Sequence, residues 1–345
     1  MAETQNVLFS SLKRVLETRE ALTRDEAARV LDYILDVDDF GSELRVAALL
    51  GALAARGETE EELAGFVDAL RARATTIPLN DDERERLVDT CGTGGDLSGS
   101  FNISTAAGLV AAAAGVWIAK HGNRAVTSRC GSADVLEAMG IPVDQSPESA
   151  AQALRTHGFA FLPAPSLQPA MKAVMPIRRA IGVRTAFNIL GPMTNPAGAR
   201  AQVLGVYAER LVPVVARTLA RLETRHAFVV HGAGMDEFTV CGPTAVGEVR
   251  DGEVWYSTVL PDDFGLKLAP IAMLAGGDAE TNAGILQAVF AGEKSARRDV
   301  VVMNAAAVLV TAGMAQGMKD GVKLAQATID DGKVTRLVYA LAEKS

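Results

Sequence analysis

Cysteine and aromatic residues are scarce in this sequence. Its 345 residues include three cysteines, Cys91, Cys130 and Cys241, which are too few and too scattered for a disulfide framework or a zinc site. This usage predicts a reducing, cytoplasmic location. Phe, Trp and Tyr together make up 5% of the chain, so we expect a core of small residues with closely packed helices.

Further absences exclude whole classes of partner. The sequence has no run of Lys and Arg, and its net charge is −8, so neither nucleic acid nor an anionic membrane is an expected partner. Residues 1–6 do not look like the start of a signal peptide. The uncharged runs 97–119 and 300–318 are dominated by Ala, Gly, Ser, Thr and Asn, which favours buried helices over membrane insertion.

The first part of the chain predicts only helices. Capping boxes begin at Thr23 and Thr59, and each is followed by apolar residues at helical spacing. Between them, Ser42 is expected to cap a helix that Gly57 ends. These segments indicate a small helical domain without catalytic candidates, separated from the rest of the chain near Pro78.

The remainder alternates between short apolar runs and helical segments. The expected strands are 86–89, 116–119, 160–162, 203–207 and 227–231. This alternation is typical of an α/β domain with a mostly parallel central sheet. Ligands of such sheets bind at the carboxyl ends of the strands.

A glycine-rich turn follows the first expected strand. Gly92, Gly94 and Gly95 permit positive φ and a bare backbone, so several N–H groups can converge on one phosphate group. The helix expected from Ile103 adds its positive end. The turn is neither a P-loop nor a dinucleotide fingerprint, because Leu97 stands at the third glycine position. Taken alone, a tight strand-to-helix connection would be the better interpretation.

Polar residues after this turn favour the phosphate site. Ser100, Asn102, Ser104 and Thr105 lie around the expected helix start, where side chains either cap free N–H groups or bind ligand oxygens. Helix capping explains one such residue better than it explains the whole set. Asp96 would repel a phosphate unless a sugar hydroxyl or a metal ion lies beside it.

Two cations follow the second expected strand, in the run Lys120-His121-Gly122-Asn123-Arg124. They would lie at the carboxyl edge of the sheet, near the glycine turn. An anionic ligand needs such a local positive pocket here, because the chain as a whole is acidic. The glycine turn, the polar helix start and these cations together indicate a site for a polyanion.

As a set, these motifs resemble the anthranilate phosphoribosyltransferase family. The matching segments are GTGGD (92–96), FNIST (101–105), KHGNR (120–124), GSAD (131–134), PAMKAVMPIRRAIGVRTAFNILGPMTNPAGA (169–199) and HGAGMDEFT (231–239). The resemblance covers essentially the whole chain and is highly specific as a set. GTGGD alone is not specific, because related nucleoside phosphorylases carry a similar turn.

The resemblance implies a small helical domain and a larger α/β domain joined by a hinge. Residues 1–78 would form the helical domain, with 165–196 returning to it, while 79–164 and 197–345 would form the α/β domain. It also implies a homodimer formed through the helical domain. The implied reaction transfers the 5-phosphoribosyl group from 5-phosphoribosyl 1-diphosphate to anthranilate, releasing diphosphate, in tryptophan biosynthesis.

The resemblance also assigns residues to the two substrates. The phosphoribosyl diphosphate would contact Gly92, Gly95, Asp96, Ser100, Asn102, Ile103, Ser104, Thr105, Lys120, Ser128 and Ser132. Anthranilate would contact Gly92, Asn123 and Arg178, whose guanidinium matches a carboxylate. Lys120 would stabilise the departing negative charge, and no residue stands out as an obligatory base.

Adjacent acids, Asp236 and Glu237, follow the last expected strand. Such acids in a loop are most often solvated, but beside a diphosphate they form a site for a hard cation such as Mg²⁺. The family resemblance favours the metal site, with one or two Mg²⁺ ions. Ser104 would contribute to a metal position on the opposite side.

The chain departs from the family pattern on the acceptor side. Leu167 and Gln168 stand where the family usually has histidines, so the phosphoribosyl side is the better supported of the two. Two other functions remain open. A pyrimidine-nucleoside phosphorylase shares the architecture, but KHGNR argues against it. A non-catalytic relative that binds nucleic acid should have lost GTGGD and gained a basic face.

Overall fold

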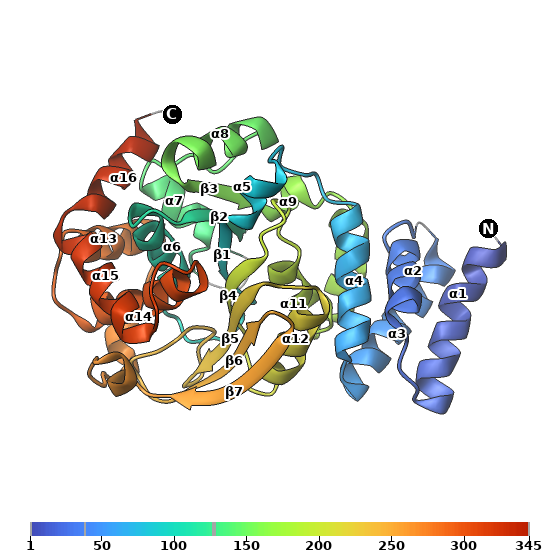
Figure 1. Cartoon of the computed structure of the whole chain (residues 1–345). Coiled ribbons are helices and arrows are strands. Elements are labelled where there is room, and N and C mark those ends of the chain that lie inside the picture. Colours follow the sequence, from blue (N-terminus) through green and yellow to red (C-terminus); the bar gives the residue numbers. More distant parts are fainter. Residues whose placement is uncertain (1, 38, 126–128, 344–345) are drawn as a thin grey trace.

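The computed structural model describes residues 2–37, 39–125 and 129–343. Figure 1 shows a group of N-terminal helices at one end and a larger part built around a sheet. The N-terminal elements are α1 (Ala2–Lys13), the π-helical turn η1 (Arg14–Thr18), α2 (Arg24–Ile34), α3 (Phe40–Arg56) and α4 (Glu60–Ala72). The predicted helical N-terminal domain is therefore confirmed.

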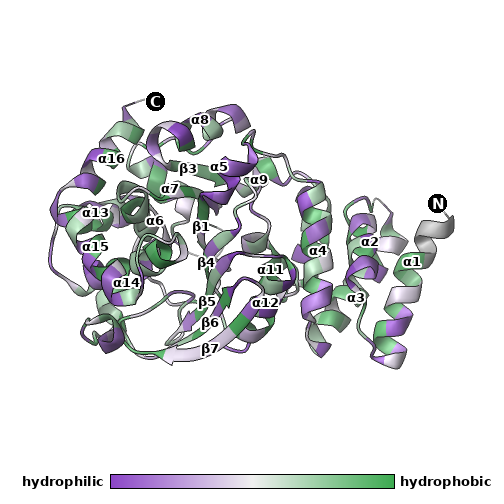
Figure 2. Cartoon of the chain, viewed as in Figure 1, coloured by the Kyte–Doolittle hydropathy of each residue, from purple (hydrophilic) through white to green (hydrophobic). Residues whose placement is uncertain are grey.

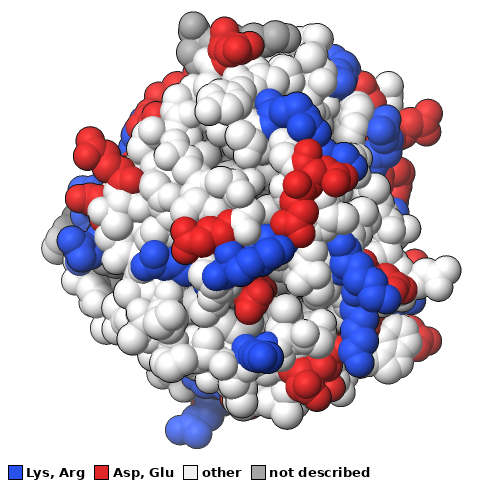
Figure 3. Space-filling view, turned by 90° about the vertical axis from the view of Figure 1, so that its left-hand side faces the viewer, with Lys and Arg blue, Asp and Glu red and all other residues white. Residues whose placement is uncertain are grey.

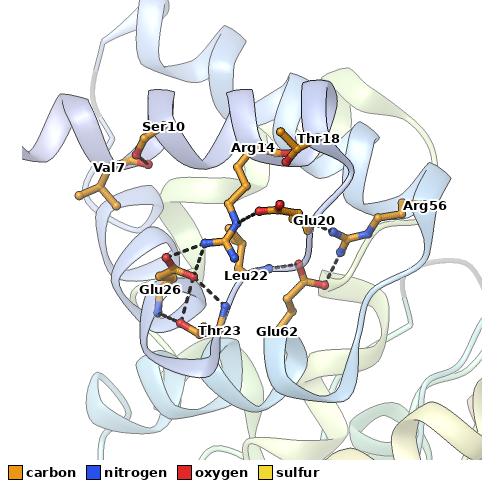
Figure 4. A network of polar contacts seen from close by, with 10 residues as sticks. All are labelled: Val7, Ser10, Arg14, Thr18, Glu20, Leu22, Thr23, Glu26, Arg56 and Glu62. Carbon is orange, nitrogen blue, oxygen red and sulfur yellow. Dashed lines mark hydrogen bonds and ion pairs between the residues drawn. The ribbon is translucent and has the colours of Figure 1, made fainter.

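Both predicted capping boxes are formed, and the second one holds three segments together. Thr23 begins α2 and Thr59 begins α4, each with its reciprocal glutamate bond. Glu62, whose side chain is fully buried, also accepts a hydrogen bond from Leu22 N (2.9 Å) and pairs with Arg56. A buried carboxylate persists only with such partners. Figure 4 shows this network between α2, α3 and α4.

The predicted start of α3 is wrong. Asp39, rather than Ser42, is the cap: its carboxylate accepts a hydrogen bond from Ser42 N at 2.9 Å. The helix therefore begins three residues earlier than expected, and Ser42 supplies a free N–H group of its first turn to the Asp39 carboxylate. The predicted end is correct, because Gly57 follows the last helical residue.

The larger part contains a seven-stranded sheet in the order β3-β2-β1-β4-β5-β6-β7. Its strands are β1 (Leu87–Gly92), β2 (Trp117–Gly122), β3 (Phe159–Pro163), β4 (Ala201–Gly205), β5 (His226–Gly232), β6 (Thr244–Arg250) and β7 (Glu253–Val259). The first five are parallel and coincide with the expected apolar runs, while β6 and β7 add antiparallel strands at one edge. The sequence did not predict this edge, because β7 is exposed along most of its length.

The remaining helices cover and flank the sheet. They are α5 (Asp81–Glu85), α6 (Ile103–Ala113), α7 (Ser132–Ala138), α8 (Pro147–His157), α9 (Ala164–Leu167), α10 (Met171–Ile181), α11 (Phe187–Leu190), α12 (Leu211–Arg221), α13 (Ala279–Phe290), α14 (Ala296–Thr311), α15 (Met318–Asp330) and α16 (Lys333–Ala342). Short 3-10 turns lie at η2 (Gly191–Met193), η3 (Pro261–Phe264) and η4 (Ile271–Leu274).

Helices pack on both faces of the sheet. Along β5, Phe228 and Val230 join the core that contains α6 and α14, whereas Ala227 and Val229 join the core that contains α12 and the N-terminal helices. This alternation follows from the two-residue period of a strand. A sheet covered on both faces confirms the predicted α/β class.

The two uncharged runs supply buried helices, as predicted. α6 lies within the first run, most of α14 lies within the second, and the two helices pack against each other in one core. Figure 2 shows the apolar colouring concentrated in the central strands and in α6, with hydrophilic residues on outer elements such as α5 and α8. Within the described part of the chain, no helix has both the length and the apolar character needed to cross a membrane.

The segment 165–196 lies against the N-terminal helices. α10 contacts α3, and α11 contacts α4. Val174 and Ile177 of α10 are buried in the same core as Val46 of α3. The division of the chain into two units at residues 78, 165 and 196 stays a prediction.

Candidate active site

The glycine turn leaves the carboxyl end of β1. Gly94 and Gly95 have φ of +64° and +74°, a conformation that glycine adopts without steric cost. At Gly92, a Cβ would lie 2.4 Å from Oδ2 of Asp236. Glycine at this position therefore allows the loop after β5 to approach the turn.

The neighbouring strand β4 holds the turn in place. Thr93 N donates to Gly205 O at 2.9 Å, and Tyr207 N donates to Thr93 Oγ1 at 3.0 Å. A Cβ on Gly205 would lie 1.5 Å from Asp236 O, so this glycine too is required by close backbone approach. Two strands and the loop after β5 thus converge at one point of the sheet edge.

The carboxylates of Asp236 and Glu237 accept hydrogen bonds from backbone N–H groups that the sequence analysis assigns to an anionic ligand. Oδ2 of Asp236 accepts from Gly94 N at 2.8 Å, and Oε1 of Glu237 accepts from Ser104 N in the first turn of α6 at 3.0 Å. Asp236 N donates in turn to Oδ2 of Asp96 at 3.3 Å. The backbone groups of the turn and of α6 therefore bind negative oxygens in this structure.

Three carboxylates lie in this region, and their proximity disfavours the charged forms of Asp236 and Glu237. Burial and the charge of Asp96 raise the pKa of Asp236 to about 7. Burial and the charge of Asp236 raise the pKa of Glu237 well above its usual value. Hard oxygen donors that share one poorly solvated volume fit a divalent cation. Among the described residues, no three His, Cys, Asp or Glu side chains are grouped so that they could hold a metal ion by themselves.

Lys120 provides the buried positive charge beside them. It lies in β2 with 1% of its surface exposed, and Nζ donates to Thr90 O at 2.6 Å and approaches Ser104 Oγ at 3.4 Å. Burial lowers the pKa of Lys120, while the nearby Asp89 opposes this effect. Lys120 therefore lies beside the start of α6.

The other residues assigned to the phosphoribosyl diphosphate surround the start of α6. Asn102 precedes the helix, but its amide bonds to Asn282 Nδ2 (2.9 Å) and Cys130 O (3.3 Å) instead of capping it. Ser100 pairs with the backbone of Ala275. Ile103 and Thr105 are buried in the core, and Ser132 begins α7. Ser128 lies outside the described residues.

Arg178 is a half-buried cation without an acidic neighbour. Its guanidinium lies 5.5 Å from the ring of Phe187, and Nη1 lies 3.7 Å from Sδ of Met175. Burial lowers its pKa, and no ion pair to it is formed within the described residues. Asn123 lies exposed after β2 and accepts from Arg124 N at 2.8 Å. The structure thus leaves Arg178 available to a carboxylate ligand.

The residues that replace the family histidines point inward. Leu167 is 3% exposed and Gln168 is 4% exposed, and Nε2 of Gln168 donates to Thr194 O at 3.0 Å. Leu167 packs with residues of β3 and of segment 165–199 in one small core. The contacts of both side chains are those of packing residues.

Arg184 is a site residue that the sequence reasoning missed. Its Nη2 donates to Gly95 O at 2.5 Å, and its guanidinium lies 4.2 Å from the ring centre of Tyr207. Arg184 follows the helix that carries Arg178, so it connects the acceptor side to the glycine turn. Its one signal in the sequence is its place in the matching segment 169–199.

Comparison with known proteins identifies the family. The chain is 50% identical over 336 residues to the anthranilate phosphoribosyltransferase of Anaeromyxobacter sp. strain Fw109-5, which covers 96% of this chain and 98% of that relative. The chain belongs to the anthranilate phosphoribosyltransferase family. Another anthranilate phosphoribosyltransferase, from Pelotomaculum thermopropionicum, is 47% identical over 338 residues, and the match covers 98% of this chain and 96% of that relative.

Family models and solved structures agree with this membership. The model described as "Glycosyl transferase family, helical bundle domain" matches residues 10–74, and "Glycosyl transferase family, a/b domain" matches residues 84–335. Anthranilate phosphoribosyltransferase from Thermus thermophilus superposes with a TM-score of 0.90 at 39% identity, over 98% of both chains. The Saccharomyces cerevisiae enzyme in complex with PRPP and Mg superposes with a TM-score of 0.85 at 27% identity, over 97% of both chains.

Proposed function

We propose that this chain transfers the 5-phosphoribosyl group of 5-phosphoribosyl 1-diphosphate to the amine of anthranilate, giving N-(5-phosphoribosyl)anthranilate and diphosphate in tryptophan biosynthesis. The observation that carries the proposal is the meeting of the glycine turn, the start of α6, Lys120 and the acidic pair at one sheet edge. Family membership supports the same reaction.

The phosphoribosyl side stabilises negative charge. The amine nitrogen attacks C1 while the C1–O bond to diphosphate breaks, so the enzyme's main task is to stabilise the departing anion and to align the amine. Lys120, and those N–H groups of the glycine turn and of α6 that Asp236 and Glu237 leave open, would bind the departing anion. We assign to this substrate Gly92, Gly95, Asp96, Ser100, Asn102, Ile103, Ser104, Thr105, Lys120, Ser128 and Ser132.

The acceptor side orients anthranilate. The guanidinium of Arg178 would bind the anthranilate carboxylate through two parallel N–H groups. Gly92 and Asn123 would complete the acceptor site. No general base is assigned, because the aniline nitrogen is already a free nucleophile and its proton can pass to its own carboxylate or to water.

Asp236 and Glu237, with Ser104, would hold one or two Mg²⁺ ions per subunit. Their oxygens suit a hard cation, and Lys120 offsets only part of the negative charge that they bring together. Bound Mg²⁺ supplies positive charge to the diphosphate oxygens. The Mg in the yeast relative with PRPP supports this assignment.

We propose a homodimer formed through the N-terminal helices. Phe9, Leu16, Phe40 and Leu44 of these helices expose between 55% and 73% of their surfaces. Four large apolar side chains exposed on one small group of helices favour burial against a partner surface. A second copy of the chain would cover them in the dimer.

We propose a cytoplasmic protein without a nucleic-acid partner. Cys91 and Cys241 are free thiols, as expected in a reducing compartment. Figure 3 views the side that lies at the left of Figure 1, where Lys and Arg are interspersed with Asp and Glu. Mixed charge of this kind supports no continuous contact with a phosphate backbone.

A fluorescence assay tests the function. Protein, Mg²⁺, anthranilate and 5-phosphoribosyl 1-diphosphate are mixed, and anthranilate fluorescence should fall only when all four are present. Persisting fluorescence together with phosphorolysis of thymidine would favour a pyrimidine-nucleoside phosphorylase. Persisting fluorescence together with a salt-dependent shift of DNA would favour the nucleic-acid-binding relative.

A further inference from the structure

Asn304 is a buried polar residue inside an otherwise apolar helix. It lies in the middle of α14 with 1% of its surface exposed, between the fully buried Met303 and Ala305. An amide buried in such surroundings is costly unless it is hydrogen-bonded. Its partners therefore indicate why it is there.

Its amide binds both backbone groups of a single loop residue. Oδ1 of Asn304 accepts from Phe238 N at 3.1 Å, and Nδ2 donates to Phe238 O at 2.8 Å and to Val300 O at 2.9 Å. Phe238 belongs to the irregular segment between β5 and β6 and has no strand partner. Asn304 thus replaces the neighbouring strand that this peptide lacks.

Phe238 directly follows the acidic pair. Asp236 N is held by Asp96 in front of the loop, at 3.3 Å, and Phe238 is held by Asn304 behind it. The loop also folds back tightly, because a Cβ on Gly232 would lie 2.5 Å from Glu237 O. Hydrogen bonds with Asp96 and with Asn304 therefore hold the loop on both sides of the two carboxylates.

We propose that Asn304 is a positioning residue for Asp236 and Glu237. By fixing the peptide after Glu237, it aims both carboxylates at the glycine turn and the start of α6, where they would hold Mg²⁺. This inference rests on the proposed function of the acidic pair. Residues that orient metal ligands change metal affinity by about 10–100-fold when they are removed.

The matched control is Thr311→Val on the same helix. Thr311 is 2% exposed, and its hydroxyl donates to Ala307 O at 2.8 Å, so this variant also loses one buried hydrogen bond of α14. Its hydroxyl bonds within the helix rather than to the loop. Asn304→Ala removes all three amide bonds, whereas Asn304→Asp keeps the shape and the acceptor but cannot donate to Phe238 O.

The test measures metal binding directly. Mn²⁺ is titrated into each protein with 5-phosphoribosyl 1-diphosphate present, free Mn²⁺ is followed by electron paramagnetic resonance, and the Mg²⁺ concentration for half-maximal activity is measured alongside. Both Asn304 variants should weaken Mn²⁺ binding and raise the Mg²⁺ requirement by about 10-fold or more, with the KM for anthranilate unchanged. Thr311→Val should leave all three values as in the wild type.

Three other outcomes would each contradict part of the proposal. If the wild type binds Mn²⁺ but either folded Asn304 variant binds it equally well, the positioning role is wrong while the proposed function stands. If Thr311→Val weakens Mn²⁺ binding as much as the Asn304 variants do, the effect is general destabilisation and the positioning role is again wrong. If the wild type with the diphosphate binds no Mn²⁺, the proposed metal site itself fails.

Discussion

Arg178 combines a positive charge with partial burial and a lack of acidic neighbours among the described residues. Its guanidinium contacts Phe187 and Met175 rather than a carboxylate. A cation in such a setting has lost part of its hydration, so a carboxylate ligand would gain a strong charge-assisted contact. This is the physical basis for assigning the acceptor to Arg178 even though Leu167 and Gln168 replace the family histidines.

Removal of this guanidinium should weaken the binding of anthranilate and leave the binding of the phosphoribosyl diphosphate almost unchanged. We expect Arg178→Ala to raise the KM for anthranilate by about 10–100-fold, because a hydrogen bond to a charged group contributes about 1.5–3 kcal/mol. The KM for the phosphoribosyl diphosphate should stay within about twofold. Arg179→Ala, which changes the exposed neighbour, is the control. An unchanged anthranilate KM in Arg178→Ala would show that the acceptor binds elsewhere.

His121 should make the fold sensitive to acid. Burial lowers its pKa to about 4, whereas an imidazole in the unfolded chain titrates near pH 6.5, roughly its ordinary pKa. The unfolded state therefore takes up the proton first as pH falls. The stability contribution is complete above about pH 6.5 and is lost between about pH 6.5 and pH 4.

A neutral residue in place of His121 should remove this pH dependence of the free energy of unfolding. Between about pH 7 and about pH 4, the free energy of unfolding of the wild type should fall by about 3 kcal/mol more than that of His121→Gln. Urea unfolding at several pH values measures both. If the two pH profiles run parallel, His121 is charged in the folded protein and the assignment is wrong.

At the scale of elements, close backbone approach between β4 and the loop after β5 shapes the site. Gly205→Ala would place a Cβ 1.5 Å from Asp236 O, so the loop must move. A shift of about 1 Å in a catalytic geometry costs about 100-fold in rate, and we expect a loss of kcat/KM of that order. Gly191→Ala is the control, because a Cβ there meets no atom within 4 Å. Normal activity of Gly205→Ala would contradict the loop geometry.

Arg184 links the segment after α10 to the glycine turn. Arg184→Ala would free Gly95 O and the face of Tyr207. Because the side chain is exposed, we expect a modest effect of about 1 kcal/mol. The KM for the phosphoribosyl diphosphate should rise by about fivefold, with little change in melting temperature. An Arg184→Ala enzyme with wild-type kinetics would show that this contact does not hold the turn.

At the scale of the whole molecule, local patterns predicted most of the fold. Capping boxes at Thr23 and Thr59 and the short apolar runs identified the helical domain and the five parallel strands, because these signals depend on neighbouring residues. The antiparallel edge was missed, since the alternation of short buried strands with helices does not extend to an exposed strand such as β7. Ser42 was misassigned because Asp39, another good capping residue, begins the helix three residues earlier and accepts from Ser42 N.

The candidate site, too, could be predicted from the sequence only in part. The glycine turn, Lys120 and the acidic pair stand in motifs that sequence reasoning could find. Their mutual contacts could not be foreseen, because Gly94 and Asp236 meet across 142 residues of sequence. Asn304 stands in none of the matching segments, and the segment 169–199 gives no sign that Arg184 contacts the glycine turn; only the folded chain brings both to the site.

Assembly is also a property of the whole molecule. We expect the wild type to sediment as a dimer and the double variant Phe40→Glu, Leu44→Glu to sediment as a monomer, because two buried charges per subunit oppose association. Leu268→Glu, at an exposed position in the α/β part, should remain dimeric. Sedimentation equilibrium measures the oligomeric state of all three proteins. A dimeric double variant would place the interface elsewhere.

The most direct test of the central claim is a crystal structure with 5-phosphoribosyl 1-diphosphate and Mg²⁺ bound. Our account predicts diphosphate oxygens close to Lys120, at those N–H groups of the glycine turn and of the start of α6 that Asp236 and Glu237 leave open, with Mg²⁺ on the side of these two carboxylates. A diphosphate bound away from this edge of the sheet, with Mg²⁺ supplied, would contradict it.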